Sequence, residues 1–90
     1  MVWGVELSDQ AQKGLRQIDP SQAQRILNFL YERVRVIEDP RAIGEALKGP
    51  KLGEFWRYRV GDFRIICAIL DEALLVLVVR IGNRRDIYRR

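Results

Sequence analysis

Histidine is absent from the 90-residue chain, and cysteine occurs once, as Cys67. The missing histidine excludes Ser-His-Asp and Cys-His nucleophiles and any proton transfer by imidazole. A zinc site would have to rest almost wholly on carboxylates, which zinc sites in proteins rarely do. Glycine-rich phosphate loops of the standard kinds are also missing. We therefore expect a protein that works without a metal or a cofactor.

Long apolar runs are missing as well. No stretch reaches the roughly 18 apolar residues needed to cross a bilayer, and Met1–Glu6 lacks the basic start and apolar stretch of a signal peptide. A single cysteine cannot form a disulfide within the chain, which suits a reducing interior. The proportions of 48% apolar and 31% charged residues are typical of a globular protein. We expect one cytoplasmic domain over residues 1–90, with no membrane partner.

Arginine, by contrast, is plentiful and concentrated near one end of the chain. Residues 1–56 hold eight basic and eight acidic side chains, whereas residues 57–90 hold eight basic and four acidic ones. The net charge of +4 therefore arises in the last third, where every base is an arginine. The planar, permanently charged guanidinium suits phosphate and carboxylate groups. This pattern predicts an anionic partner, either a nucleic acid or an acidic protein.

The first half of the chain contains one strand signal and two helix signals. Alternating apolar residues predict a strand over Val2–Leu7. A serine N-cap predicts a helix over Ser8–Ile18, although Gly14 weakens it. A capping aspartate followed by proline begins a second helix, and apolar residues at helical spacing extend it over Asp19–Ile37. Asp39-Pro40 then ends that helix.

The second half is dominated by strand signals. Residues rich in β-branched and aromatic side chains predict strands over Phe55–Val60, Phe63–Leu70 and Leu74–Ile81, joined by tight turns. The almost continuous apolar run of the last strand indicates a central strand that is buried on both faces. We therefore expect an α+β protein of order β-α-α-β-β-β, in which the N-terminal helices pack on one face of an antiparallel sheet.

Alternation along the first of these strands places Arg57 and Arg59 on one face and Trp56 and Tyr58 on the other, toward the helices. Two arginines on one face repel each other unless an anion lies between them. A solvated edge strand, where charges prevent aggregation, explains the pair about equally well. Hairpin pairing across the following turn would bring Arg64 next to Arg59.

The end of the chain carries further candidates. Gly82 permits a sharp exit from the last strand, so Arg84 and Tyr88 are able to fold back over the same face of the sheet. Alternatively, Tyr88 anchors the terminus and Asp86 forms a local ion pair. The candidate site is the set of residues that would converge there: Arg57, Arg59, Arg64, Arg84 and Tyr88.

The segment Leu47–Arg90 resembles the RelE family of bacterial toxins, and Trp56–Ile66 and Arg80–Arg89 are the most specific parts of the likeness. The order of elements and Asp39-Pro40 fit in the first half. The resemblance implies the fold of small microbial ribonucleases and ParE toxins. It also implies cleavage of messenger RNA in the ribosomal A site, and inhibition by a cognate RelB-like antitoxin that wraps the toxin.

The resemblance also assigns roles by position. Arg57 and Arg59 match two basic strand positions that contact phosphate and take part in catalysis. Arg64 matches the arginine that stabilises the charged transition state, and Arg84 matches one that contacts the phosphate or the leaving group. Tyr88 matches a C-terminal tyrosine that activates the nucleophile or stacks on the substrate.

Two features depart from the family pattern. Asn83 stands where many relatives carry histidine, and Arg57 and Arg59 stand where some carry lysine. Asparagine cannot shuttle a proton, and arginine, with a pKa above about 12, is a poor general base. If relatives rely on those residues for proton transfer, this chain is expected to be slower or to use a different base.

Cleavage of RNA without a metal uses the substrate's own 2′-hydroxyl as nucleophile and leaves a 2′,3′-cyclic phosphate. The arginines would clamp the phosphate, and Tyr88 is the conventional proton-transfer candidate. A ParE-like, non-catalytic inhibitor of DNA gyrase fits the same fold and charge but gives Tyr88 no chemical role. A generic RNA-binding domain would expose aromatic side chains among the arginines. We favour the ribonuclease, with the gyrase inhibitor as the alternative.

Overall fold

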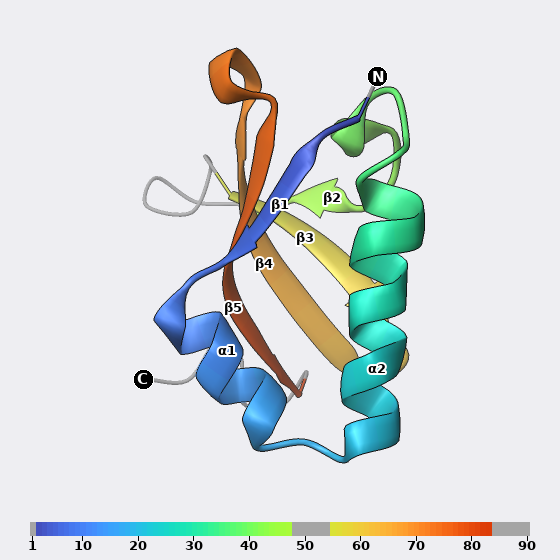
Figure 1. The fold of residues 1–90 in the computed structure, drawn as a ribbon, viewed down its shortest axis with the longest axis vertical. Coiled ribbons are helices and arrows are strands. Elements are labelled where there is room, and N and C mark those ends of the chain that lie inside the picture. The colour runs from blue at the N-terminus through green and yellow to red at the C-terminus, as the bar shows by residue number, and fades with distance from the viewer. Residues whose placement is uncertain (1, 48–54, 84–90) are drawn as a thin grey trace.

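A computed structural model describes residues 2–47 and 55–83 of the chain (Figure 1). Its helices and strands, in chain order, are β1 (Gly4–Leu7), α1 (Asp9–Arg16), α2 (Pro20–Phe29), β2 (Glu45–Ala46), β3 (Phe55–Val60), β4 (Phe63–Leu70) and β5 (Leu75–Asn83). A π-helical turn, Leu30–Val34, follows α2, and short 3-10 turns cover Pro40–Ala42 and Asp71–Ala73. None of the helices in these residues is long and apolar enough to cross a membrane.

The strands of the described residues form one sheet in the order β1-β5-β4-β3-β2, and the helices lie on one side of it (Figure 1). The α+β class is confirmed, as are the antiparallel meander of β3, β4 and β5 and the bounds of β3 and β4. The sheet is nevertheless mixed, because β1 runs parallel to β5. Parallel neighbours need a long connection, which the chain between β1 and β5 supplies. The edge strand β2 was not predicted.

Both α-helices begin at the predicted caps. The side chains of Ser8 and Asp19 each accept a hydrogen bond at 3.1 Å from a backbone N–H of the first turn. α1 ends two residues before the predicted Ile18. The second helix changes to the π-helical turn and ends before the predicted Ile37. There the carbonyl oxygen of Arg35 accepts a hydrogen bond at 2.8 Å from the backbone N–H of Trp3, so the end of the helical segment is joined to the residue that precedes β1.

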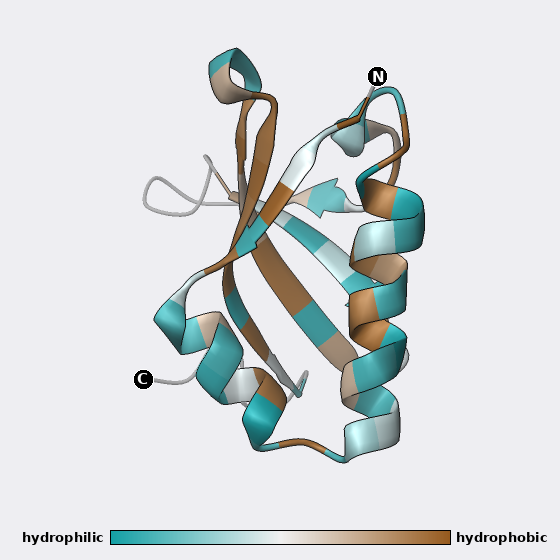
Figure 2. Ribbon diagram, in the orientation of Figure 1, coloured by the Kyte–Doolittle hydropathy of each residue, from teal (hydrophilic) through white to brown (hydrophobic). Residues whose placement is uncertain are grey.

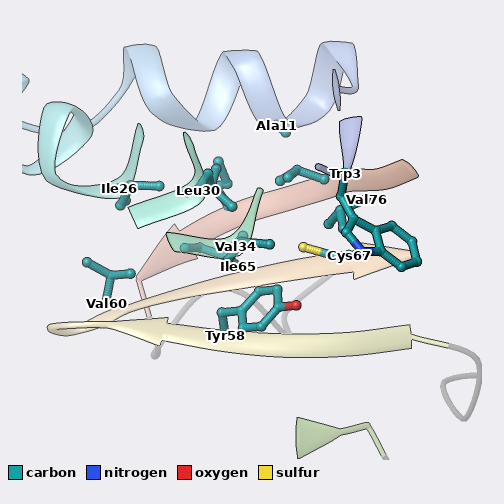
Figure 3. Packing of buried hydrophobic residues seen from close by; sticks show 12 residues of the cluster. Trp3, Ala11, Ile26, Leu30, Val34, Tyr58, Val60, Ile65, Cys67 and Val76 are labelled. Carbon is teal, nitrogen blue, oxygen red and sulfur yellow. The ribbon is translucent and has the colours of Figure 1, made fainter. Parts of the chain in front are cut away.

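The core lies between the helices and the sheet. Ile26, Leu30 and Val34 form the predicted apolar stripe and are completely buried. Figure 3 shows these side chains gathered above Tyr58 and Ile65, which rise from β3 and β4. The same segregation is visible in the colouring of Figure 2, where brown residues of α2 turn toward the brown strands.

β5 lies inside the sheet, between β1 and β4, as its apolar run indicated. Its burial alternates, however. Val76 and Val78 are completely buried in the core, whereas Leu75 and Leu77 are half-buried. The prediction that this strand is buried on both faces was therefore wrong, because the helices of the described residues all cover one face.

Gly14, which weakens α1 by propensity, has a packing role. A Cβ atom at this position would overlap the carbonyl oxygen of Ile81, so the backbone of α1 touches the backbone of β5 here. Only glycine permits this approach. The glycine therefore fixes how closely α1 packs against the end of β5.

Replacing Gly14 by Ala should lower the free energy of unfolding by about 1–3 kcal/mol, because the added methyl group must push the helix away from the strand. This is the net change, because the overlap of the methyl group with a backbone carbonyl oxygen costs more than the roughly 1 kcal/mol that alanine gains in helix propensity. Urea unfolding followed by circular dichroism measures the change. Gln10→Ala, at an exposed position of the same helix, should change the stability by less than about 0.5 kcal/mol. Equal or greater stability of Gly14→Ala would contradict the packing role.

Candidate functional site: an arginine face on the sheet

Arg57 and Arg59 extend from the side of β3 that faces away from the helices. Tyr58 and Val60, which alternate with them, are buried in the core at 1% and 7% exposure. The hydroxyl of Tyr58 donates a hydrogen bond at 2.6 Å to the carbonyl oxygen of Pro40. The predicted division of the strand into an arginine side and an aromatic side is confirmed. Arg59 is exposed, whereas Arg57 is half-buried.

Arg64 joins the same side of the sheet. It is the direct partner of Arg59 in the pairing of β3 with β4, so the two side chains extend from the same face. Arg64 is only 9% exposed, and its Nη1 donates a hydrogen bond at 3.3 Å to the carbonyl oxygen of Phe63. Like charges directly opposite each other destabilise a sheet. An anion bound between Arg59 and Arg64 would remove this cost.

Arg80 is a fourth arginine on this face, and sequence reasoning missed it. Strict alternation along β5 would place Arg80 in the core with Val76 and Val78. The register of β4 and β5 shifts by one residue between Ile66 and the next position, so that Arg80 pairs with Ile66. A bulge of this kind moves the following side chains to the other face. The only feature of the sequence that could have indicated this position is that Arg80 is the one charged residue in β5.

We call Arg57, Arg59, Arg64 and Arg80 the arginine face. Arg57 forms an ion pair with Glu45, its direct partner on β2. The side chain of Glu45 is 52% exposed and that of Arg57 is 24% exposed. Glu45 was not among the predicted site residues, because the two-residue strand that positions it leaves no periodic pattern in the sequence. The arrangement offers guanidinium groups to a phosphate, with a carboxylate beside them.

The remaining predicted residues lie elsewhere. Arg84 and Tyr88 fall outside the described residues. Asn83 pairs with Phe63, a residue that packs against the core, so it extends from the helix side of the sheet and not from the arginine face. There it lines a hollow of about 530 Å³ between α1 and the end of β5, together with Lys13.

Two buried groups are unsuited to chemistry at neutral pH. Burial raises the pKa of the Tyr58 phenol far above its usual value, so this side chain stays a neutral hydrogen-bond donor. Burial likewise raises the pKa of the Cys67 thiol, which disfavours the reactive thiolate. Within residues 2–47 and 55–83, no three potential ligands of the His, Cys, Asp or Glu type gather in one place.

Comparisons with known proteins agree on one kind of relative. A family model described as "ParE toxin of type II toxin-antitoxin system, parDE" matches residues 5–88. Toxin RelG of Mycobacterium tuberculosis is 28% identical to this chain over 90 residues, which span the full length of both.

Solved structures show the same fold. One is a toxin–antitoxin complex of the RelBE type from Mycobacterium tuberculosis, with a TM-score of 0.84 and 22% identity, covering 96% of this chain and 95% of the other. Another is the isolated E. coli RelE toxin, with a TM-score of 0.69 and 16% identity, covering 90% of this chain and 83% of the other.

If the arginine face binds phosphate, Arg59→Ala should weaken the binding of single-stranded RNA. It should also reduce the slope of the logarithm of the binding constant against the logarithm of salt concentration by about 0.7, one phosphate contact. Fluorescence anisotropy across a salt series measures both quantities. Arg16→Ala, an exposed arginine on α1, is the matched control and should leave the slope unchanged. Equal effects of the two substitutions would show that the charge acts without a defined site.

Proposed function

The chain belongs to the ParE toxin family of type II toxin–antitoxin systems, within the RelE/ParE superfamily, and we propose that it is an mRNA endoribonuclease. In this proposal it depends on the ribosome but not on a metal, and it inhibits translation by cutting the message in the A site. The observation that carries the proposal is the direct pairing of Arg59 with Arg64, with Arg57 and Arg80 on the same face. Such a cluster suits a phosphate that gains charge during reaction.

The reaction would proceed by attack of a 2′-hydroxyl on the adjacent phosphate, leaving a 2′,3′-cyclic phosphate. Arg57 and Arg59 would contact the phosphate oxygens, and Arg64 would stabilise the additional negative charge of the transition state. Arg64 suits this role because it is held by the backbone of the β3–β4 turn before any substrate arrives. Arg84 would contact the phosphate or the leaving group, and Tyr88 would assist proton transfer or stack on the substrate.

The proposed partner is a RelB-like antitoxin. Several structural relatives are described as complexes of RelE with RelB, from Mycobacterium tuberculosis, Pyrococcus horikoshii and Methanococcus jannaschii. For this chain, an acidic segment laid over the arginine face would neutralise the repulsion between Arg59 and Arg64 and exclude RNA. The toxin and its ribosomal target would meet in the cytoplasm.

The description of the matching family as ParE toxins favours a second candidate, inhibition of DNA gyrase without catalysis. In that case the arginines would serve only for docking to an acidic or nucleic-acid surface. A supercoiling assay with purified gyrase, run beside an assay of message cleavage on programmed ribosomes, separates the two functions. Cleavage without gyrase inhibition supports the first, and the reverse result supports the second.

Arg64→Ala and Tyr88→Phe should each reduce the single-turnover rate of cleavage of ribosome-bound message by about 10²–10⁴-fold, because each removes a group that acts on the transition state. Primer extension on a defined message measures the cuts. Since Arg64 is buried, circular dichroism must show that Arg64→Ala is folded. Arg16→Ala should cleave at the wild-type rate. Unchanged cleavage by both Arg64→Ala and Tyr88→Phe would refute this assignment of the site.

A further inference from the structure

The hollow between α1 and the end of β5 adjoins the arginine face. It has a volume of about 530 Å³, and Arg80, a member of the arginine face, is one of the residues that line it. Gly82, the direct partner of Arg64 in the pairing of β4 with β5, lines it as well. The hollow and the arginine face therefore meet at the end of β5, and a ligand that binds one can extend into the other.

This end of β5 has a helix beside it in place of a strand. β1 pairs with β5 only from Leu75 to Val78, whereas β5 continues to Asn83. Beyond Val78 the neighbour of β5 is α1, whose backbone at Gly14 touches the carbonyl oxygen of Ile81 (Figure 1). The side chains of α1 therefore border the part of β5 that carries the hollow.

One side of α1 faces the hollow. Four residues at helical spacing line it: Gln10, Lys13, Gly14 and Gln17. Ala11 and Leu15, which alternate with them along the helix, pack in the core. The side chains of Gln10, Lys13 and Gln17 are exposed. This side of the helix thus presents two carboxamides and one ammonium group to the hollow.

The arginines indicate the direction in which an RNA strand crosses the sheet. Arg59 lies on β3, Arg64 lies opposite it on β4, and Arg80 lies on β5. Neighbouring strands are about 4.8 Å apart, so these three positions follow one another over roughly 10 Å across the sheet. A backbone whose phosphates contact them in turn leaves the sheet at the edge of β5, where the hollow begins.

The groups around the hollow suit a nucleobase. A carboxamide carries both a donor and an acceptor and can pair with the edge of a base, and lysine donates to the acceptor atoms of bases. Half-buried Phe63 adds an apolar wall. The volume lies within the range of about 300–1,000 Å³ that is usual for small-molecule sites. A protein partner would instead anchor an aromatic or apolar side chain in an apolar pocket, which this polar lining does not offer.

We propose that this hollow holds the base of the nucleotide next to the scissile phosphate on the β5 side, an inference that rests on the proposed ribonuclease function. Gln10 and Gln17 bond the edge of the base, and Lys13 donates to one of its acceptor atoms. The arginine face holds the backbone, which is the same in every message, whereas the hollow contacts a group that differs between messages. The preference for certain cleavage sites thus arises on α1 and not on the arginine face.

The test compares wild type with the double variant Gln10→Ala, Gln17→Ala in binding short oligonucleotides, measured by fluorescence anisotropy. The strands carry 2′-fluoro sugars, which lack the attacking hydroxyl, and a single abasic position is moved along the series. For wild type, removing the base at one position should weaken binding by roughly 5–150-fold, the discrimination expected of one good contact to a base edge. In the double variant the loss at that position should shrink to less than about twofold. Its affinity for a fully abasic strand should stay within about threefold of wild type, because the arginines still hold the phosphates.

The double variant should fold, because both glutamines are exposed and alanine favours a helix. Gln24→Ala is the matched control, since Gln24 is an exposed glutamine on α2, and it should bind every strand as wild type does. If the double variant keeps the wild-type loss at every abasic position, or binds all strands more weakly by one common factor, the hollow does not hold a base.

Cleavage of message on programmed ribosomes separates this inference from the function on which it rests. If wild type cuts no message but the double variant loses its sensitivity to the missing base, the ribonuclease function fails and the base site is supported. If wild type cuts message and both proteins bind the abasic series alike, the base site alone is overturned.

Discussion

The packing of β3 and β4 beneath α2 determines the direction of every arginine on the hairpin. Tyr58, Val60 and Ile65 are buried in the core between the sheet and α2. Burial of such side chains contributes roughly 1.5–3 kcal/mol each. A slip of one residue in the register would exchange the two faces and expose all of them. The arginines therefore stay together on the opposite face in spite of their mutual repulsion, because the apolar core on the other side outweighs it.

Local patterns predicted the parts of the fold that depend on near neighbours. The caps at Ser8 and Asp19 and the bounds of β3 and β4 could be read from a few adjacent residues. The sides of β3 on which Arg57 and Tyr58 lie followed from alternation alone. Arg59 and Arg64 could be brought together because a two-residue turn fixes the register of a hairpin.

Contacts between distant segments, and local breaks in periodicity, could not be predicted in this way. The parallel pairing of β1 with β5 joins residues about seventy positions apart. β2 exists because Gly44 allows two residues to lie against β3, and two residues are too few to show a period. The bulge at Val79 places Arg80 on the arginine face, whereas strict alternation along β5 would place it in the core. Glu45 and Arg80, the two residues added to the candidate site, were both missed for these reasons. The assignment of Arg84 and Tyr88 to the site still rests on the sequence.

The buried thiol of Cys67 can be used to measure how often the folded protein opens. The thiol is fully buried at the centre of the sheet, on β4, and no other cysteine occurs in the chain. A thiol reagent can modify it only in molecules whose sheet has separated from the helices, so the labelling rate measures how often that happens. An antitoxin that binds the folded state would slow this labelling by mass action. The native sequence thus carries an internal measure of how strongly a partner stabilises the toxin.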